Sequence, residues 1–295
     1  MKNILYKLTV IIFLILIFFK KEVMYITIYE TTLIWFKNIV PNLLPMFIVT
    51  SYIINSNLIF NICNILGYPF KKIFKTSIYG VYVFILSLFT GTPSNAKYLK
   101  DLQDNNLISS KEKDKLLLFT LNYNPILITS LLTLYLTKQT SYIILFIVII
   151  SNIFIGILNR NIKCNILQAN YNIKKQTLSQ IVKNTIDTLL MILGTLIFFN
   201  IIINILPIKN PLIKNILNGF LEITTALKDL QYLNLSPNIK TLLTIIYLSF
   251  GSLSIHMQIK SILPDTNYNL FLKSRILCIL LSILQLILFH SMGLL

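Results

Sequence analysis

The sequence is poor in charged residues. Only 12% of its 295 residues are Asp, Glu, Lys or Arg, which is about half the usual share of a soluble domain. The hydrophobic fraction is 55% and the mean hydropathy is +0.75. Too few charged side chains are present to cover that much apolar surface in water. These shortages exclude an ordinary water-soluble enzyme and a disordered chain.

Cysteine and histidine are also scarce. Three cysteines, Cys63, Cys164 and Cys278, lie far apart and are odd in number, which excludes a disulfide framework and a zinc cluster with closely spaced ligands. His256 and His290 are the two histidines, and neither an HExxH nor a GxSxG motif is present. We therefore expect no enzyme activity, no catalytic residue, no metal site and no cofactor.

Acidic residues and arginine are few. Ten acidic residues face 26 basic ones, giving a formal net charge of +16, and only Arg160 and Arg275 are arginines. No basic stripe with interleaved aromatic residues is present, so nucleic acid is not an expected partner. Positive charge beside apolar segments is instead typical of membrane proteins.

Long apolar runs are what the sequence has in abundance. A helix needs about 20 apolar residues to span roughly 30 Å of hydrocarbon. Nine runs approach that size, four of them unbroken and five interrupted by Pro, Gly or Asn: 4–19, 142–158, 186–206 and 272–290, and then 43–66, 77–93, 116–136, 211–227 and 239–257. The sequence predicts an all-α, polytopic membrane protein with about eight to nine hydrophobic segments. Because Lys20 and Lys21 follow the first run without a small-residue cleavage site, we interpret that run as a retained anchor.

The lysine-rich segments predict the topology. They fall at 71–75, 97–115 and 160–183, and the positive-inside bias places all three in the cytoplasm. The run 77–93 then starts and finishes on one side, so we expect a re-entrant half-helix that turns near Gly91 and Pro93.

A weak internal similarity indicates two related halves. Residues 84–102 can be aligned with 244–263 so that Gly91 matches Gly251 and Ser94 matches Ser254. Corresponding broken helices in two halves are typical of repeat-built transporters. We divide the chain into an N-terminal anchor and linker (1–38), a first half with broken helices (39–160), a cytoplasmic loop (161–185) and a second half with broken helices (186–295).

The interrupted runs carry the candidate binding residues. Backbone that is not helical at membrane depth has to be buried in protein or line a wet cavity. Free N–H groups where a half-helix begins favour an anionic or polar solute. The predicted substrate-binding residues are Gly91, Pro93, Ser94, Asn95, Lys97, Asn122, Asn124, Thr224, Gly251, Ser254 and Gln258.

Glu222 and His256 are candidates for proton coupling. A carboxylate inside an apolar run is costly and usually functional, and a histidine could share its work. The alternatives are a solvated Glu222 at the membrane interface and a His256 that only makes hydrogen bonds between helices. Lys97 could either pair with a solute carboxylate or extend to the interface.

The same residues resemble the motifs of a known family. Gly91-Thr-Pro93-Ser-Asn-Ala96-Lys97 resembles the motif GYPxGAK, and Leu117 to Pro125 resembles LLxFxNNxGP, in the YlbJ-type sporulation integral membrane proteins. In the second half, residues 219–224 resemble GLLEMT and residues 250–258 resemble FGGLSxHxQ, while residues 44–47 resemble LLPFF. The departures are Thr92 in place of the aromatic residue, Asn95 in place of the second glycine, and Tyr123-Asn124 in place of a Ser-Gly pair.

This family belongs with the nucleoside-recognition, or Gate-domain, membrane proteins. The resemblance implies a fold similar to concentrative nucleoside transporters. It also implies transport of dipicolinic acid across the outer forespore membrane by alternating access. The alternatives are a carrier of nucleosides or other polar solutes, and a non-transporting assembly protein of sporulation. The expected partners are a small anionic or polar solute and the lipid bilayer, and no motif specifies an oligomer.

Overall fold

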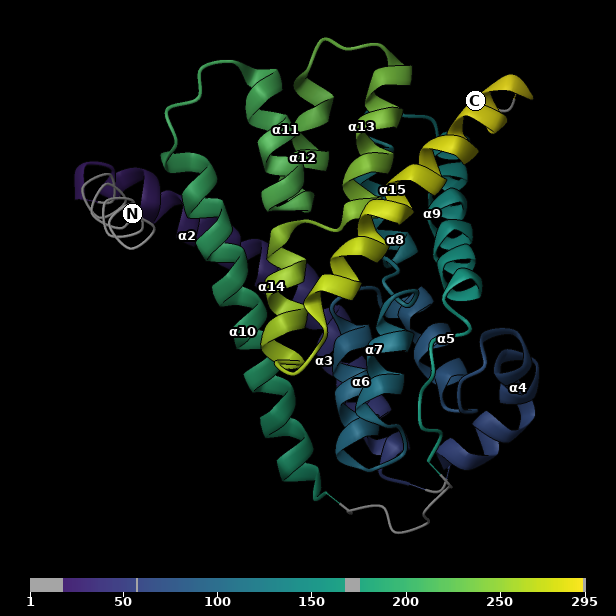
Figure 1. The fold of residues 1–295 in the computed structure, drawn as a ribbon. Coiled ribbons are helices and arrows are strands. Elements are labelled where there is room, and N and C mark those ends of the chain that lie inside the picture. Colours follow the sequence, from purple (N-terminus) through teal and green to yellow (C-terminus); the bar gives the residue numbers. More distant parts are fainter. Residues whose placement is uncertain (1–17, 57, 168–175, 294–295) are drawn as a thin grey trace, which may run out of the picture.

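The structure is a computed structural model that describes residues 18–56, 58–167 and 176–293. Regular structure in these ranges is entirely helical (Figure 1). The expected anchor run 4–19 lies almost wholly outside the described residues. The helices are α2 (Lys21–Ile34), η1 (Trp35–Ile39, a π-helical turn), α3 (Val40–Ile54), α4 (Leu58–Phe74), α5 (Gly80–Thr90), α6 (Ser94–Asp104), α7 (Ser110–Leu117), α8 (Pro125–Leu132), α9 (Lys138–Leu158), α10 (Leu178–Ile205), α11 (Pro211–Leu221), α12 (Ile223–Asp229), η2 (Leu230–Tyr232, a 3-10 turn), α13 (Pro237–Phe250), α14 (Leu253–Ile262) and α15 (Tyr268–Ser291).

Within the described ranges, five helices are long and apolar enough to cross a membrane. They are Lys21–Ile54, Lys138–Leu158, Leu178–Ile205, Pro237–Ile262 and Tyr268–Ser291. The chain is therefore a polytopic all-α membrane protein. The predicted number of eight to nine hydrophobic segments is not supported, because several apolar runs form short helices such as α5, α8 and α11 instead of full spans.

Local sequence signals set where the short helices begin and end. Gly91 ends α5 with φ +76° and Gly251 ends α13 with φ +71°, a region that glycine enters without steric cost. Asn124 caps α8, accepting a hydrogen bond from the Leu127 amide at 3.0 Å, and Pro125 occupies the first helical position. Glycine and proline thus interrupt apolar runs that hydropathy alone reads as spans.

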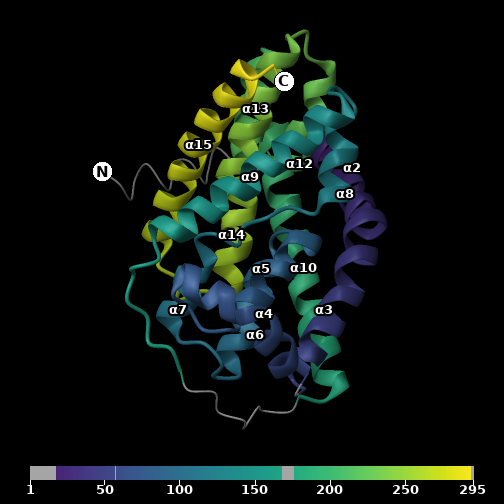
Figure 2. The ribbon, with the colours of Figure 1, turned by 90° about the vertical axis from the view of Figure 1, so that its right-hand side faces the viewer.

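One flank of the molecule is formed by α10 packed against α2 and α3 (Figure 2). The segment formed by α2 and η1 runs antiparallel to α10, since Asn204 contacts Thr27 at 3.1 Å, Asn200 contacts Thr31 at 3.2 Å, and Trp35 Nε1 donates to the Leu189 carbonyl at 3.1 Å. Hydrogen bonds between helices supply the specificity that lipid-exposed apolar surfaces lack.

Helices α9, α13 and α15 pack together on the other side (Figure 1). Ser282 contacts Ser151 at 2.8 Å and accepts from Ser249 at 2.9 Å, so one small polar residue joins all three helices. Small residues let membrane helices approach closely.

Two helical hairpins enter the space between these flanks. In the first, α5 turns back into α6, and Tyr98 donates to Thr90 Oγ1 at 3.1 Å across the pair. In the second, α11 turns back into α12, and Asn215 Nδ2 donates to the Ala226 carbonyl at 2.9 Å. The α11–α12 hairpin descends from the upper end in Figure 1, whereas α5 and α6 lie toward the lower end.

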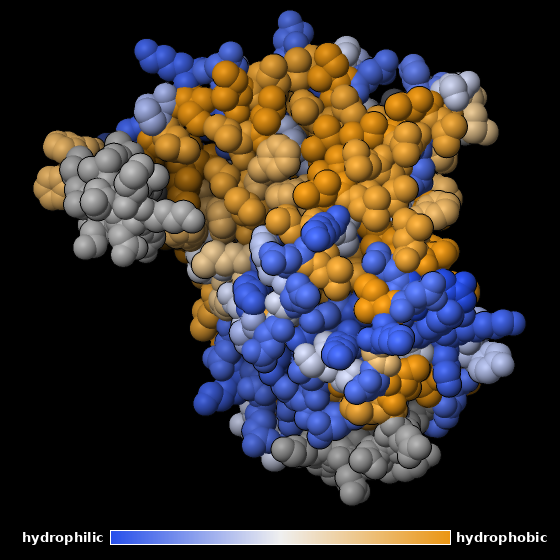
Figure 3. Space-filling model, viewed as in Figure 1, coloured by the Kyte–Doolittle hydropathy of each residue, from blue (hydrophilic) through white to orange (hydrophobic). Residues whose placement is uncertain are grey.

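The surface has an apolar part and a hydrophilic part. Figure 3 shows apolar residues over the upper region and hydrophilic residues over the lower region, where α6 and α7 lie. We call this lower region the basic end; it holds Lys71, Lys72, Lys75, α6, α7 and the segment after α9. Leu280, Leu284 and Ile287 on α15 are 55–59% exposed, which in water would leave a large uncovered apolar face. These features identify an integral membrane protein.

Candidate functional site

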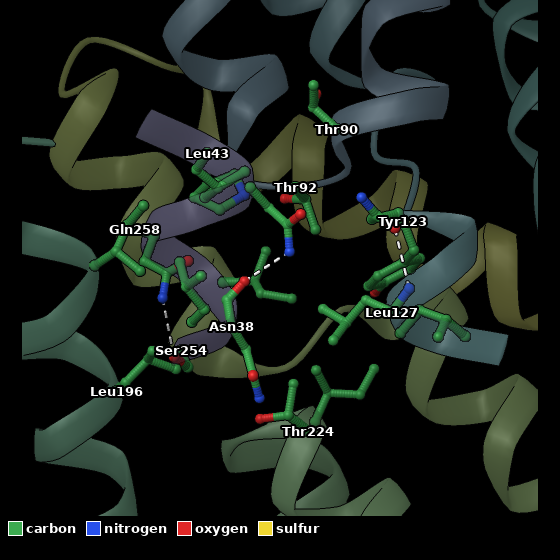
Figure 4. A pocket seen from close by; sticks show the side chains of 18 of the residues that line it. Asn38, Leu43, Thr90, Thr92, Tyr123, Leu127, Leu196, Thr224, Ser254 and Gln258 are labelled. Carbon is green, nitrogen blue, oxygen red and sulfur yellow. Dashed lines mark hydrogen bonds between the residues drawn. The ribbon is translucent and has the colours of Figure 1, made fainter. Parts of the chain in front are cut away.

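A cavity of about 100 Å³ lies where the interrupted segments meet (Figure 4). A cavity needs roughly 10–15 Å³ of accessible volume to hold one water molecule, so several waters or a small polar group fit. Its polar lining consists of Asn38, Asn42, Thr90, Thr92, Tyr123, Asn124, Glu222, Thr224, Ser254 and Gln258, and its apolar lining consists mainly of Ile39, Leu43, Leu127, Ile128, Ile192, Leu196, Ile223 and Ile255.

The structure brings six of the predicted site residues to this cavity. They come from four different segments of the chain and are Pro93, Asn124, Glu222, Thr224, Ser254 and Gln258. In Figure 4, Thr90 and Thr92 lie on the side of the cavity opposite Thr224, and Gln258 lies opposite Tyr123. The remaining predicted residues lie outside the lining: Gly91, Ser94, Asn95, Lys97, Asn122, Gly251 and His256.

Gly91 and Gly251 act through the backbone. A Cβ atom at Gly91 would lie 2.5 Å from the Asn124 amide nitrogen, so the tip of the first hairpin approaches the residue that caps α8. A Cβ atom at Gly251 would lie 3.0 Å from Leu121. The two glycines occupy different kinds of element, because α5 turns back at Gly91 whereas α13 continues into α14 after Gly251. Their alignment in the sequence therefore does not match equivalent structural positions.

Four helices begin at the cavity. Pro93, Asn124 and Glu222 precede the first residues of α6, α8 and α12, and Ser254 lies in the first turn of α14. The first N–H groups of a helix lack intrahelical partners and carry partial positive charge. The cavity is thus surrounded by helix ends that attract electronegative atoms.

Glu222 is buried, with 2% of its surface exposed, and acts as the cap of α12. Its carboxylate accepts from the Thr224 hydroxyl at 2.7 Å, the Thr225 amide at 2.8 Å and the Thr224 amide at 3.2 Å. The carboxylate therefore satisfies two backbone N–H groups at the start of α12 that have no partner within the helix. Of the described residues that line the cavity, Glu222 alone carries a formal charge.

Gln258 and Tyr123 connect the cavity wall to neighbouring helices. Gln258 Nε2 donates to Thr195 Oγ1 on α10 at 3.0 Å and to Ser254 Oγ at 3.3 Å. The Tyr123 hydroxyl donates to the Leu248 carbonyl at 2.8 Å, near the end of α13 where carbonyl groups lose their helical partners. Tyr123 therefore satisfies a backbone carbonyl beside the α13–α14 break, and Gln258 joins α14 to α10.

Two of the predicted ionisable residues point elsewhere. His256 contacts the Tyr268 hydroxyl through Nδ1 at 2.9 Å and the Phe250 carbonyl through Nε2 at 3.0 Å, and its ring stacks on Phe250. Lys97 Nζ donates to Asp101 Oδ1 at 2.6 Å in a buried ion pair. Both residues have protein partners that account for their position, and neither touches the cavity.

Asn122 belongs to a buried network that sequence reasoning missed. It donates to Ser87 Oγ at 2.8 Å and accepts from Asn152 Nδ2 at 3.2 Å, while Asn152 Oδ1 accepts from Arg275 Nη1 at 3.2 Å. Arg275 Nη2 also donates to the Leu118 carbonyl, and Asn152 Nδ2 donates to the Leu121 carbonyl at 2.7 Å. The network therefore satisfies backbone groups of the non-helical segment 118–124. The sequence feature that could have predicted this network is the single arginine, Arg275, inside an apolar run.

Asn38 and Asn42 are the other missed lining residues. They lie one turn apart around the π-helical turn η1, and Asn42 Nδ2 donates to the Asn38 carbonyl at 2.7 Å. Such turns are frequent at functional sites. The sequence feature that could have predicted these two lining residues is a pair of asparagines four residues apart in an apolar helix.

The lining does not resemble a metal centre. In residues 18–56, 58–167 and 176–293, no group of three or more His, Cys, Asp or Glu side chains could hold a metal ion. Amides, hydroxyls, one carboxylate and aliphatic side chains are the groups that this cavity offers to a ligand.

Comparison with known proteins gives a distant match. The chain is 23% identical, over 281 aligned residues, to the sporulation integral membrane protein YlbJ of Bacillus subtilis (strain 168), and the alignment covers 79% of this chain and 69% of that protein. No protein-family model matches the chain, and no solved structure matches it. The chain therefore shows a distant similarity to the YlbJ-type sporulation integral membrane proteins.

Proposed function

We propose that the protein is a carrier for a small polar solute in endospore formation, and that the solute is dipicolinic acid crossing the outer forespore membrane. The observation that carries the proposal is the cavity at which four helices begin inside a membrane protein. Membrane transporters bind their substrates where discontinuous helices meet, because free backbone groups there can bond a polar solute. Binding and movement require no covalent chemistry and no cofactor from the protein.

The order of elements supports a repeat-built carrier. Each half would contribute a re-entrant hairpin followed by a broken helix: α5–α6 then α7–α8, and α11–α12 then α13–α14. The tips of both hairpins and the breaks of both helices contribute to the cavity through Thr92, Asn124, Glu222 and Ser254. Such an arrangement suits alternating access, in which one group of helices moves against the other around the bound solute.

The helix ends favour a solute with electronegative atoms. The N-termini of α6, α8 and α14 direct partial positive charge toward the cavity, which suits a carboxylate. The absence of Lys and Arg from the described lining favours a second candidate, a neutral polar solute such as a nucleoside, which amides and hydroxyls bind well.

Glu222 is our candidate for proton coupling. It is buried at the tip of the second hairpin and faces the cavity, where a bound solute would lie near its carboxylate. Neutralising it would remove charge from the hairpin tip while its threonine partners stay in place. His256 is a second candidate that would act from behind the α13–α14 break.

The test is uptake of radiolabelled dipicolinate into vesicles that contain the purified protein. Ser254→Ala should lower the uptake rate about fivefold, since one hydrogen bond contributes about 0.5–1.5 kcal/mol. Glu222→Gln should retain the cap on α12 but abolish the response of uptake to an imposed proton gradient. Ser291→Ala and Glu30→Gln, on exposed positions away from the cavity, are the matched controls and should leave uptake unchanged.

Competition identifies the solute. Excess unlabelled dipicolinate should suppress uptake, whereas nucleosides should suppress it only if the neutral-solute candidate is correct. If neither Ser254→Ala nor Glu222→Gln changes dipicolinate uptake, the cavity is not the binding site. Spore formation that survives both variants but fails when the basic loops are deleted would favour the non-transporting assembly role.

A further inference from the structure

A second cavity, of about 320 Å³, lies at the basic end next to the first one. Its charged and polar lining consists of Lys97, Lys100, Asp101, Asp104, Gln176, Asn184, Asp187, Thr188 and Ser261. Helices α10 and α14 line both cavities, while α6 lines the second cavity and Pro93, the residue just before α6, lines the first. We call this second cavity the basic-end vestibule.

The lining residues form one stripe on each of these helices. On α14, Ser254 and Gln258 line the central cavity, and Ser261 lines the vestibule one turn further on. Pro93, the residue that caps α6, lines the central cavity, and Lys97 in the first turn of α6 lines the vestibule. Residues spaced by three or four lie on one face of a helix. The vestibule therefore continues the central cavity toward the basic end.

A buried ion pair lies in the vestibule wall, one turn along the chain from Pro93 in the wall of the central cavity. Lys97 Nζ and Asp101 Oδ1 are 2.6 Å apart, their side chains are 7% and 10% exposed, and Ser51 Oγ on α3 donates to Asp101 Oδ2 at 2.8 Å. One turn further along α6, Lys100 and Asp104 form a similar pair at 2.8 Å, but their side chains are 43% and 48% exposed. The first pair holds α6 against α3, whereas the second faces open space.

Lys97 supplies a cation that the central cavity lacks. It is one helical turn from Pro93 in the cavity wall, so a carboxylate entering from the vestibule meets Lys97 before it reaches the cavity. An incoming carboxylate can replace Asp101 as the partner of Lys97, because both present the same oxygen acceptors. Exchange of partners keeps Lys97 paired but leaves the buried Asp101 carboxylate without its cation, which weakens the Asp101–Ser51 contact that holds α6 against α3.

We infer that the vestibule is the route by which a carboxylate solute enters from the basic end, and that the Lys97–Asp101 pair is its gate and first binding site. The inference rests on the proposed carrier function and adds an entry side, a gate and a preference for an anionic solute. Asp187 and Thr188 on α10 form the opposite polar wall of this route. The structure has the gate closed.

Thiol labelling from the basic end tests the gate without relying on transport. In a Cys164→Ser background, a cysteine replacing Leu196 reports on the central cavity and one replacing Ser261 reports on the vestibule. With a membrane-impermeant reagent, Asp101→Asn should speed labelling of the Leu196→Cys site about tenfold, within the range typical of coupled equilibria. Asp104→Asn, in the exposed pair, is the matched control and should change nothing.

The cysteine that replaces Ser261 is the control for a folding defect. The Ser261→Cys site should be labelled equally in both variants, since it lies outside the gate. Dipicolinate should also speed labelling of the Leu196→Cys site when Lys97 is present and have no effect after Lys97→Met. Equal labelling of the Leu196→Cys site in the Asp101→Asn and Asp104→Asn proteins would overturn the gate. If Asp101→Asn speeds labelling of the Leu196→Cys site but vesicles show no uptake of dipicolinate or nucleosides, the gate stands and the proposed carrier function is overturned.

Discussion

At the scale of single residues, the most telling side chain is Arg275. It is completely buried on α15, packs over the Phe271 ring at 5.6 Å, and takes part in none of the ion pairs in the described ranges. A buried charge without a counter-ion is costly unless hydrogen bonds replace its water shell. Here the replacements are the Leu118 carbonyl and Asn152, so Arg275 holds the non-helical segment 118–124 beside the cavity.

Arg275→Lys should therefore lower the unfolding free energy by about 1–3 kcal/mol, because one amine cannot reach every acceptor that the guanidinium fork reaches. The measurement is thermal unfolding of the purified protein in detergent. Arg160→Lys is the matched control at the only other arginine, which contacts the Lys72 carbonyl at 3.4 Å on the surface, and it should cost less than about 0.5 kcal/mol. Equal costs for the two variants would contradict the role of Arg275.

At the scale of elements, α7 joins loops at the basic end through two buried charges. Lys115 Nζ donates to the Lys75 carbonyl at 2.9 Å and to the Arg160 carbonyl at 2.8 Å, which lie near the ends of α4 and α9. The Glu112 carboxylate accepts from the Ser77 amide at 2.5 Å. Burial raises the pKa of Glu112 above its ordinary value, and the hydrogen bond from Ser77 opposes that rise.

The raised pKa of Glu112 makes stability depend on pH in a definite direction. The folded protein keeps the carboxyl proton to a higher pH than the unfolded chain does. The stabilisation is complete below the ordinary carboxyl pKa of about 4.3 and is lost as the pH rises through the folded-state pKa. Glu112→Gln keeps an acceptor for Ser77 and should remove this decline.

Thermal unfolding in detergent between about pH 4 and 8 checks this dependence. Asp265→Asn, on the exposed loop between α14 and α15, is the control and should follow the unmodified protein. If Glu112→Gln and the unmodified protein lose stability in parallel as the pH rises, another group is responsible.

At the scale of the whole molecule, the sequence predicts where the apolar helices are broken but not which side chains face the cavity. Gly91, Pro125 and Gly251 interrupt apolar runs in the sequence itself, so the positions of the breaks follow from local chemistry. Which side chains face the cavity depends on how each helix is rotated against distant partners. The pairing of Lys97 with Asp101 follows from their i, i+4 spacing on one helix. By contrast, His256 turns toward Tyr268 in the next helix, a contact that no local pattern specifies.

The same limit applies to the number of spans. Hydropathy over 77–93 and 211–227 gives runs close to spanning length, but Gly91 and Glu222 sit at hairpin tips, and the chain turns back there. A turn and a continuing break have similar residue types, so Gly91 and Gly251 look alike in sequence although only the first reverses the chain. Packing between helices distinguishes them, and that information is spread over the whole chain.

The topology of the molecule gives a final prediction. The basic end should face the cytoplasm, because lysine-rich loops are retained there, and the α12–α13 connection should face the opposite side. Cys164 lies half-buried in the segment after α9, while Cys63 and Cys278 are buried. An impermeant thiol reagent should therefore label Cys164 only after cells expressing the protein are permeabilised.

A cysteine replacing the exposed Asn234, in a Cys164→Ser background, should be labelled in intact cells. Labelling of Cys63 and Cys278 should need denaturation, which provides an internal control for folding. Labelling of Cys164 in intact cells would invert the topology, and the vestibule would then open away from the cytoplasm.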